Sequence, residues 1–269
     1  MDEKCILKIN HVTSFLGSTK VLDNVSLDIK PGTLNGLIGV NGSGKTSLIN
    51  TINGLIKPTE GSLDIDDLSL DSIPDKDIAK LIATVPQNPT NMLGFSCLDV
   101  VLMGRNPYIP IGGWPNGSDI DIAYQSMKST GVDQFAKRTL DTLSGGEIQR
   151  VFIAKGLAQG TGILLLDEPI ANLDISYQIQ IMDILLSLVH EQNFTIITSL
   201  HDINLASLYC DNLIVIDKGA IVKTGPPSGI IEKDFIQSIF GNRLDVIRNP
   251  EDNRSIIIPK SINLSLIHI

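Results

Sequence analysis

The stretch from Gly39 to Thr46, GVNGSGKT, constrains this chain more than any other feature of its sequence. It matches the pattern G-x-x-x-x-G-K-[ST], in which glycines let backbone N–H groups turn inward around phosphate oxygens. The apolar segment LNGLIGV leads into it and SLINTINGL follows, so the loop stands between an expected buried strand and an expected helix. That helix would point its positive N-terminal end at the phosphates. The predicted nucleotide-binding residues are Gly39, Val40, Asn41, Gly42, Ser43, Gly44, Lys45, Thr46 and Ser47.

Two side chains of this loop and two acids further on suggest phosphate chemistry. The Lys45 ammonium suits the β- and γ-phosphates, and the Thr46 hydroxyl can ligate Mg²⁺. Asp167 and Glu168 follow the apolar run ILLL, at the strand end where open α/β sheets place their ligands. Alone, two acids at a strand end are more often simply solvated. Beside a phosphate loop, we expect Asp167 to hold Mg²⁺ and Glu168 to orient the attacking water.

Short apolar runs without polar alternation predict strands buried on both faces of a mostly parallel sheet. Apolar residues at helical spacing in 175–190 predict a helix between two of these runs, which gives an α/β fold. Extended pieces within 5–30 precede the first parallel strand, and DKGAIVKTG at 217–225 suggests a strand, a turn and a return. The expected buried strands lie at 34–40, 163–167, 195–200 and 213–217.

The sequence changes character between 89 and 142, where loop-like stretches flank helical segments. Because apolar residues persist there, we expect an inserted helical subdomain, at about 89–160, rather than a linker. After Gly241 the sequence resembles a hairpin with NPEDN as its turn, which opens a C-terminal extension at 241–269. The last residues, SINLSLIHI, fit either an edge strand or a disordered tail.

Composition excludes several classes of protein. The 269 residues carry a formal net charge of −9 with a pI near 4.8, so no global basic field favours nucleic acid. Three well-separated cysteines indicate free thiols in a reducing compartment. Neither a signal peptide nor a membrane-spanning run is visible, so we expect a soluble chain in the cytoplasm unless another protein holds it at a membrane.

The stretch LSGGE at 143–147 resembles a second glycine-rich helix start. Ser144 and Glu147 have capping-box spacing, and a capped helix would be the simplest explanation. A cap alone does not call for Gly145 and Gly146, which each cost up to about 1 kcal/mol of helix propensity. They leave backbone N–H groups open at a positive helix end, which is an anion site. One chain with one nucleotide does not need it, unless it serves a nucleotide held by another chain.

LSGGE, with QR shortly after it, resembles the signature motif of the ATP-binding-cassette (ABC) ATPases, and five other motifs follow that family's order. GVNGSGKT resembles its Walker A motif and ILLLDE its Walker B motif. Gln87 in VPQ resembles the Q-loop glutamine, Asp174 in ANLD the D-loop aspartate, and His201 in SLHD the switch histidine. The resemblance covers about residues 5–240 and implies a P-loop NTPase fold.

The resemblance also implies roles and partners. Glu168 and His201 would be catalytic, while Gln87, Asp174 and the signature residues Ser144, Gly145 and Gly146 would join the phosphate loop in binding ATP. Mg²⁺ would be held by Thr46, Gln87 and Asp167. Two cassettes of the family pair head-to-tail, so each signature closes on the partner's ATP. The adenine-stacking position is occupied by Leu16, with Phe15 beside it, where the family has a tyrosine.

Two further stretches resemble those in ATPase subunits of iron–siderophore, haem or cobalamin importers. They are VLMGRNPYIP at 101–110 and the region 201–225. That group implies a homodimer on two integral-membrane permease subunits, at the cytoplasmic side of the cell membrane, which receives cargo indirectly from a substrate-binding protein. Arg105, Pro107 and Tyr108 would then lie at the permease interface, or in an ordinary surface loop. An importer of zinc or phosphonate, or an iron–sulfur assembly ATPase, remains the alternative.

Overall fold

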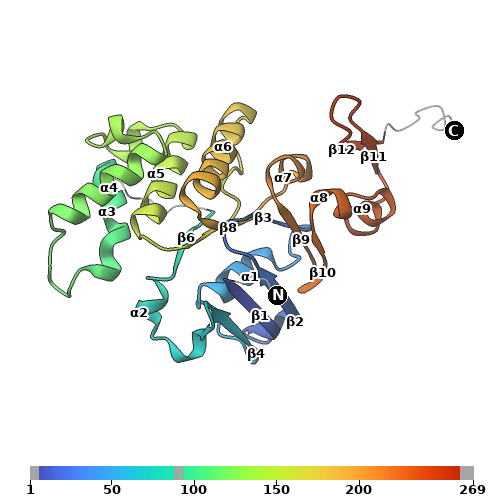
Figure 1. Ribbon diagram of the computed structural model, residues 1–269, viewed down its shortest axis with the longest axis horizontal. Helices are drawn as coiled ribbons and strands as arrows, with labels where there is room; N and C mark the ends of the chain where they lie inside the picture. The colour runs from blue at the N-terminus through green and yellow to red at the C-terminus, as the bar shows by residue number, and fades with distance from the viewer. Residues whose placement is uncertain (1–5, 88–91, 93, 261–269) are drawn as a thin grey trace.

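The computed structural model describes residues 6–87, 92 and 94–260, and its centre is a six-stranded sheet (Figure 1). The strand order is β10-β9-β3-β8-β7-β6, parallel from β9 to β6, with β10 antiparallel at one edge. This confirms the expected parallel core and the antiparallel return after it. The strands are β3 (Leu34–Ile38), β6 (Ile82–Val85), β7 (Ile163–Leu166), β8 (Thr195–Ser199), β9 (Asn212–Asp217) and β10 (Ala220–Gly225).

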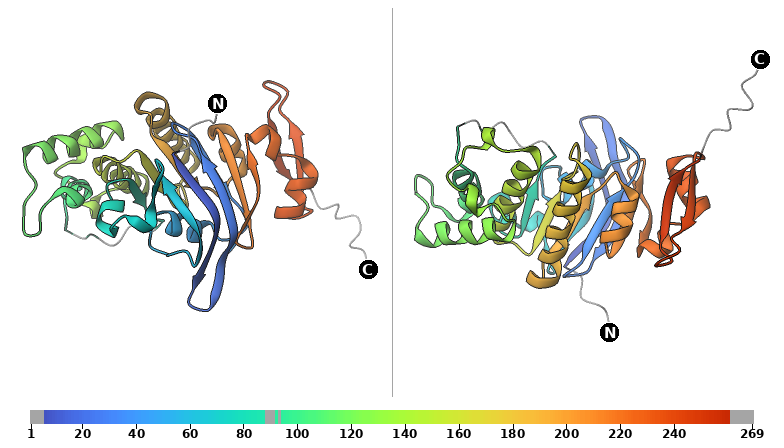
Figure 2. Two further views of the ribbon diagram at one scale, coloured as in Figure 1. Left: turned by 60° about the horizontal axis from the view of Figure 1, so that its bottom comes forward. Right: turned by 90° about the horizontal axis from the view of Figure 1, so that it is seen from above.

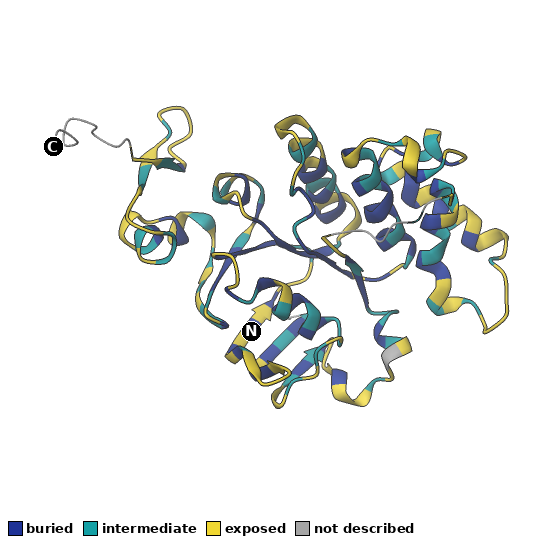
Figure 3. Ribbon diagram, turned by 180° about the vertical axis from the view of Figure 1, so that it is seen from behind, coloured by how far each residue is buried: buried dark blue, intermediate teal, exposed yellow. Residues whose placement is uncertain are grey.

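The apolar runs lack polar alternation because both faces of this sheet are covered. On β7, Leu164 and Leu166 pack into one hydrophobic core, while Ile163 and Leu165 pack into a second core on the opposite face. Figure 3 shows the buried residues gathered along the sheet and on the elements that face it. The helices that cover the sheet are α1 (Lys45–Ile52) on one side, and α5 (Gly145–Ala158), α6 (Ile175–Gln192) and α7 (Ile203–Tyr209) on the other.

A second, antiparallel sheet lies beyond α1 and closes the second core. Its strand order is β2-β1-β4-β5, which confirms the extended pieces expected before the first parallel strand. Its last strands and the link to β6 have no counterpart among the expected elements. The bounds are β1 (Leu7–Leu16), β2 (Thr19–Ile29), β4 (Glu60–Ile65) and β5 (Leu68–Ser69), followed by η1 (Leu70–Ser72) and α2 (Asp75–Ile78).

A helical region lies at one end of the molecule, within the segment where an inserted subdomain is expected (Figure 1). Its core joins Val100 and Val101 to Met127 and Phe152. Where the insertion begins and ends remains a prediction. The elements are α3 (Cys97–Leu102), η2 (Met103–Tyr108), α4 (Gly117–Ser129), η3 (Asp133–Phe135), η4 (Leu140–Thr142) and α5.

Arg105 is a structural residue of this region, and the expectation that it lies at a surface interface is wrong. It is 9% exposed, and its Nε donates to Asp119 Oδ1 at 2.9 Å while a terminal nitrogen donates to the Ala158 carbonyl at 2.9 Å. Its guanidinium lies 4.1 Å from the centre of the Tyr108 ring. Arg105 therefore ties η2 to α4 and α5, whereas Tyr108 remains 40% exposed.

The C-terminal extension forms the predicted hairpin, at the end of the molecule opposite the helical region (Figure 2). Asn204 on α7 holds it: the side-chain amide donates to the Ile257 carbonyl at 3.0 Å and accepts the Ile257 N–H at 2.8 Å. The segment expected as an edge strand or a tail, 261–269, lies outside the described residues. The helices α8 (Pro227–Ile230) and α9 (Lys233–Phe240) precede the extension, and its hairpin consists of β11 (Leu244–Arg248) and β12 (Ser255–Pro259).

Among the described residues, no helix combines the length and the hydrophobicity that crossing a membrane requires.

Candidate nucleotide-binding site

The glycine-rich loop between β3 and α1 adopts backbone angles that call for glycine. Gly42 and Gly44 have φ of 77° and 113°, in the left-handed region that disfavours other residues. At Gly39 a Cβ would lie 2.2 Å from the Ile216 carbonyl oxygen and 2.6 Å from Ser43 Oγ. The first glycine is therefore needed for close packing against β9, and the later two for the turn into the helix.

Lys45 is held inside this loop. Its side chain is buried, and Nζ donates to the Gly39 carbonyl at 2.9 Å and the Val40 carbonyl at 3.3 Å. Burial lowers the pKa of Lys45, and the nearby carboxylates of Glu168 and Asp167 oppose that shift. The loop therefore encloses a cationic group at the place where phosphate oxygens are expected.

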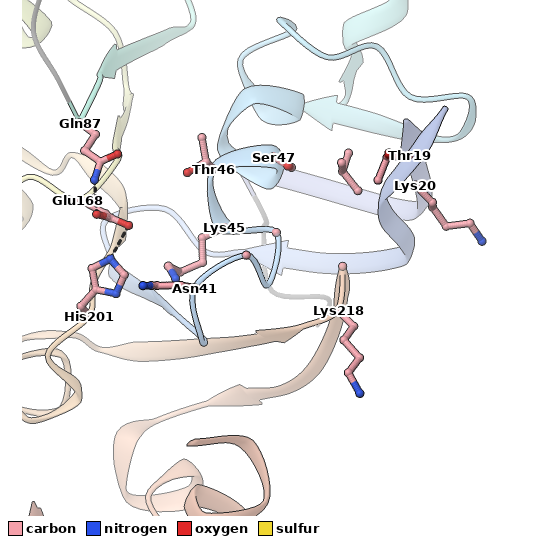
Figure 4. A pocket seen from close by; sticks show the side chains of 14 residues that line it. Thr19, Lys20, Asn41, Lys45, Thr46, Ser47, Gln87, Glu168, His201 and Lys218 are labelled. Carbon is pink, nitrogen blue, oxygen red and sulfur yellow. Dashed lines mark hydrogen bonds and ion pairs between the residues drawn. The ribbon is translucent and has the colours of Figure 1, made fainter. Parts of the chain in front are cut away.

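A cavity of about 630 Å³ opens over this loop, within the usual size range of ligand pockets (Figure 4). It brings together most of the predicted residues, although they come from distant parts of the chain. Of the residues predicted from the sequence, those that line it are Asn41, Gly42, Gly44, Lys45, Thr46, Ser47, Gln87, Glu168 and His201.

Other predicted residues lie outside the lining of this cavity. Ser43 is buried within the loop and its hydroxyl has no hydrogen-bond partner among the described residues, while Asp167 is buried just behind Glu168. The predicted residues that are not among the lining are Gly39, Val40, Ser43, Asp167, Ser144, Gly145, Gly146 and Asp174.

The far wall of the cavity consists of residues that the sequence does not reveal. The start of β2 contributes Thr19, Lys20 and Val21, and the turn between β9 and β10 contributes Lys218 and Gly219. Phe15 and Leu16, the two adenine-stacking candidates, are 40% and 64% exposed and are not among the described residues that line the cavity. Phe15 on β1 pairs with Lys20 on β2, and it is Lys20 that lines the cavity. Identifying the lining residues therefore requires the register of the two strands, which the sequence does not show.

Three polar side chains meet at the mouth of the cavity. Each follows the end of a neighbouring parallel strand: Gln87 after β6, Glu168 after β7 and His201 after β8. Gln87 Nε2 donates to Glu168 Oε2, and His201 Nε2 lies 2.5 Å from Glu168 Oε1 (Figure 4). A carboxylate fixed on both oxygens beside an enclosed lysine is suited to orienting water against a phosphate.

A buried hydroxyl also fixes the two acids. Ser199, the last residue of β8, donates its hydroxyl to Asp167 Oδ1 at 2.7 Å and accepts the Glu168 N–H at 2.7 Å. Glu168 has φ of 48°, which is uncommon for a residue with a side chain. The left-handed backbone conformation of Glu168 sets the direction of its carboxylate, and the hydrogen bond to Ser199 stabilises that conformation.

The residues proposed for Mg²⁺ offer the oxygen ligands that this cation prefers: a hydroxyl, an amide oxygen and a carboxylate. Thr46 and Gln87 line the cavity, and the Asp167 charge is near enough to Lys45 to oppose the lowering of its pKa by burial. With one carboxylate among three protein ligands, Mg²⁺ would be bound together with phosphate oxygens, as is usual for this cation. The three residues therefore fit Mg²⁺ in the presence of a nucleotide.

The signature stretch starts α5 as the predicted capping box. Glu147 N–H donates to Ser144 Oγ at 3.4 Å, and Ser144 N–H donates to Glu147 Oε2 at 2.8 Å. These bonds from Ser144 hold the pKa of Glu147 below its ordinary value. Ser144 is exposed. Asp174, which precedes α6, is also exposed, and its side chain makes no capping hydrogen bond.

The two glycines of this stretch differ in what a side chain would meet. That both leave open backbone N–H groups remains a prediction. A Cβ on Gly146 would lie 2.6 Å from the Tyr177 ring, so packing against α6 explains this glycine. A Cβ on Gly145 would meet only Leu173, at an ordinary 3.4 Å. Gly145 is exposed, and no packing contact among the described residues requires a glycine there.

Comparison with known proteins agrees with this geometry. The chain is 36% identical over 244 residues to the cobalamin import ATP-binding protein BtuD of Halobacterium salinarum, an alignment that covers 91% of this chain but 61% of that protein. It is 34% identical over 254 residues to the petrobactin import ATP-binding protein FpuD of Bacillus anthracis, covering 94% of this chain and 93% of the relative.

A solved structure and a family model point the same way. The dimeric ATP-binding cassette MJ0796, in a post-hydrolysis state bound to ADP and Pi, superposes with a TM-score of 0.71 at 31% identity, covering 82% of this chain and 98% of that one. The family model described as ABC transporter matches residues 22–171, which include the phosphate loop, Gln87, the signature stretch and both acids. The chain belongs to the ABC transporter family, as an ATP-binding cassette.

Proposed function

We propose that this chain is the ATP-hydrolysing subunit of an ABC importer for an iron–siderophore, haem or cobalamin-type cargo. The observation that carries the ATPase assignment is the meeting of Gln87, Glu168 and His201 at the mouth of the phosphate-loop cavity. The similarity to import ATP-binding proteins named for cobalamin and petrobactin supports the cargo group. The chain spans about three fifths of the length of the first of these relatives, so its activity, substrate and partners are inferred.

In the proposed reaction, each part of the cavity has one task. The loop's N–H groups and Lys45 bind the β- and γ-phosphates of ATP. Thr46, Gln87 and Asp167 would hold Mg²⁺, which when bound neutralises charge on the phosphate oxygens. Glu168 orients water for attack, while His201, 2.5 Å from it, holds the γ-phosphate geometry.

The signature residues act on a second copy of the chain. Ser144 and Gly145 are exposed and lie outside the chain's own cavity, as does Asp174. A head-to-tail homodimer would place them on the partner's ATP, where the open N–H groups of a helix start suit an anion. The dimeric state of the MJ0796 cassette with ADP and Pi supports this arrangement.

The dimer would work on the cytoplasmic side of the cell membrane, bound to two integral-membrane permease subunits. Cargo would reach these permeases from a substrate-binding protein, which the cassette does not touch. Support for this assembly comes from family membership and from the import proteins to which the chain is similar.

Replacing Glu168 by Gln tests the ATPase assignment. The change keeps the size of the side chain and removes the carboxylate, so ATP binding should persist while turnover falls by roughly 10²–10⁴, the effect of a lost general base. ATP should then trap a dimer that gel filtration detects. The matched control is Glu191→Gln, the same exchange on an exposed position of α6, which should turn over like the unmodified chain. Near-normal turnover in Glu168→Gln would sink the assignment.

A further inference from the structure

Ser199 links the two acids that follow β7 through one hydroxyl. The residue is fully buried at the end of β8. Its Oγ donates to Asp167 Oδ1 at 2.7 Å and accepts the Glu168 N–H at 2.7 Å. The bond from the Glu168 N–H is at the short end of its range, and the bond to Asp167 has the usual length but is to a carboxylate, which makes it the stronger of the two.

The bond to Glu168 acts on a conformation that needs support. With φ of 48°, Glu168 lies in the left-handed region, which L-residues with a side chain adopt only at a cost in free energy. Its N–H would otherwise lack a partner beside the buried strand ends. Because this turn directs the carboxylate toward Gln87 and His201, the Ser199 bond helps to set that direction.

The bond to Asp167 acts on the other acid. Asp167 is 6% exposed, and its N–H donates to the Val85 carbonyl at 3.0 Å, so its backbone is fixed to β6. Ser199 then fixes one of its carboxylate oxygens. The same hydroxyl therefore couples the position of a proposed Mg²⁺ ligand to the turn that carries the proposed water-orienting carboxylate.

The neighbouring residue shows that a buried hydroxyl on β8 is not by itself a bridge. Thr198 is as deeply buried as Ser199, yet its Oγ1 has no hydrogen-bond partner among the described residues. Successive strand residues face opposite sides of the sheet, so only Ser199 is placed toward the acids.

We propose that Ser199 is a positioning residue for ATP hydrolysis, which holds Asp167 and Glu168 in one fixed relation. Ser199 is fully buried and is not among the residues that line the phosphate-loop cavity, so it would act through the two acids. The proposal rests on the roles proposed above for Asp167 and Glu168.

The test compares Ser199→Ala with the matched control Thr198→Val, which removes the unpartnered hydroxyl next to it on the same strand. We would measure kcat and KM for ATP, the Mg²⁺ concentration that gives half-maximal rate, and the affinity for ATP in EDTA. Ser199→Ala should lower kcat by about 10- to 100-fold, the effect of losing a hydrogen bond to a charged group. The half-maximal Mg²⁺ concentration should rise. KM and the EDTA affinity should change less than about twofold, because the phosphate loop is untouched, and Thr198→Val should alter none of the four.

Two kinetic results would overturn the proposal. One is a kcat of Ser199→Ala within about twofold of the unmodified chain, equal to that of Thr198→Val. The other is a parallel loss of kcat and of ATP affinity in EDTA, because a merely structural role disturbs the whole cavity. If the alanine variant does not fold, Ser199→Cys fills the space with a weaker hydrogen-bond partner and should give the same separation of kcat from EDTA affinity. Failure of both variants to fold would also assign Ser199 a structural role and overturn the proposal.

Measuring Glu168→Gln alongside separates this inference from the proposed function. Normal turnover in Glu168→Gln would remove the ATPase assignment itself. A large loss in Glu168→Gln, with full turnover in Ser199→Ala, would leave the assignment standing and refute only the positioning role.

Discussion

Two glycine-rich stretches of this chain begin helices, and they do so in different ways. At 39–46 the loop wraps around a buried lysine, and the chain itself supplies the walls of the cavity above it. At 143–147 the helix starts with an exposed capping box, and its residues take no part in that cavity. The first site can bind phosphate within one chain, whereas the second presents open backbone to a surface. The proposed head-to-tail dimer would bring the second stretch onto a partner's phosphates.

The comparison also separates two reasons for glycine within the signature stretch itself. Gly146 is buried where a side chain would collide with Tyr177, so the fold requires it. Gly145 is exposed and has room for a Cβ, so the fold does not. Since the fold of the single chain does not require a glycine at position 145, we expect its role to lie in the proposed dimer.

Replacing Gly146 should therefore have the largest effect on the free energy of unfolding. Gly146→Ala should lower the free energy of unfolding by about 1–3 kcal/mol, because its methyl group overpacks the contact with the Tyr177 ring. Gly145→Ala should change it by less than about 0.5 kcal/mol, as at an open surface position. Urea unfolding of the two isolated chains measures both values. Equal changes in the free energy of unfolding would contradict the claim that only Gly146 is packed too closely to accept a side chain.

A smaller effect concerns the capping box and depends on pH. Bonds from Ser144 depress the pKa of Glu147 below its ordinary 4.5, so the folded-state pKa is lower than the unfolded one. The carboxylate therefore stabilises the fold fully above about pH 4.5, and this contribution is lost as pH falls through the folded-state pKa. Glu147→Gln should lower the free energy of unfolding by about 0.5 kcal/mol at pH 7, the effect of an acid at a helix N-terminus.

The pH profile distinguishes this effect from a general loss of packing. The unfolding free energies of Glu147→Gln and the unmodified chain should converge as pH falls below about 4.5. A difference that stays constant from pH 7 down to pH 3 would show that the Glu147 charge does not contribute.

Much of the fold could be predicted because burial leaves a plain trace in the sequence. The strands β3, β7, β8 and β9 are apolar on both faces, since each face packs into its own core, and their runs are visible without any structure. The C-terminal hairpin was indicated by its turn residues. β6 has four residues, too few for a pattern to stand out, although it carries Gln87 to the site.

The site was less predictable, because its parts meet through the topology of the sheet. Glu168 was assigned from its place after an apolar run, and Gln87 and His201 by family resemblance; no local pattern shows that the three touch. Lys20 lines the cavity from the start of β2 and Lys218 from the turn between β9 and β10, which depends on how the two hairpins are placed. Arg105 looked like a loop residue because its partner, Asp119, stands 14 positions away within a capping box.

The central claim, that each ATP lies between Lys45 of one chain and the signature residues of another, can be tested by mixing two inactive variants. Lys45→Ala removes the cationic group from one half of the site. Gly145→Asp places a carboxylate where the γ-phosphate must lie; the position is open, and an acid suits a helix N-terminus, so the fold should persist. Gly145→Asn, which has the same size without the charge, is the matched control and should retain more activity.

The measurement is the ATPase rate of the two variants against their mixing ratio. Each homodimer should be inactive, but a mixed dimer has one site with both changes and one site with neither. At equal amounts, roughly a quarter of all sites are intact, so about a quarter of the unmodified rate should return. If mixed dimers form and the rate stays at background at every ratio, the signature stretch does not complete an independently working site on a second chain, and the account is contradicted.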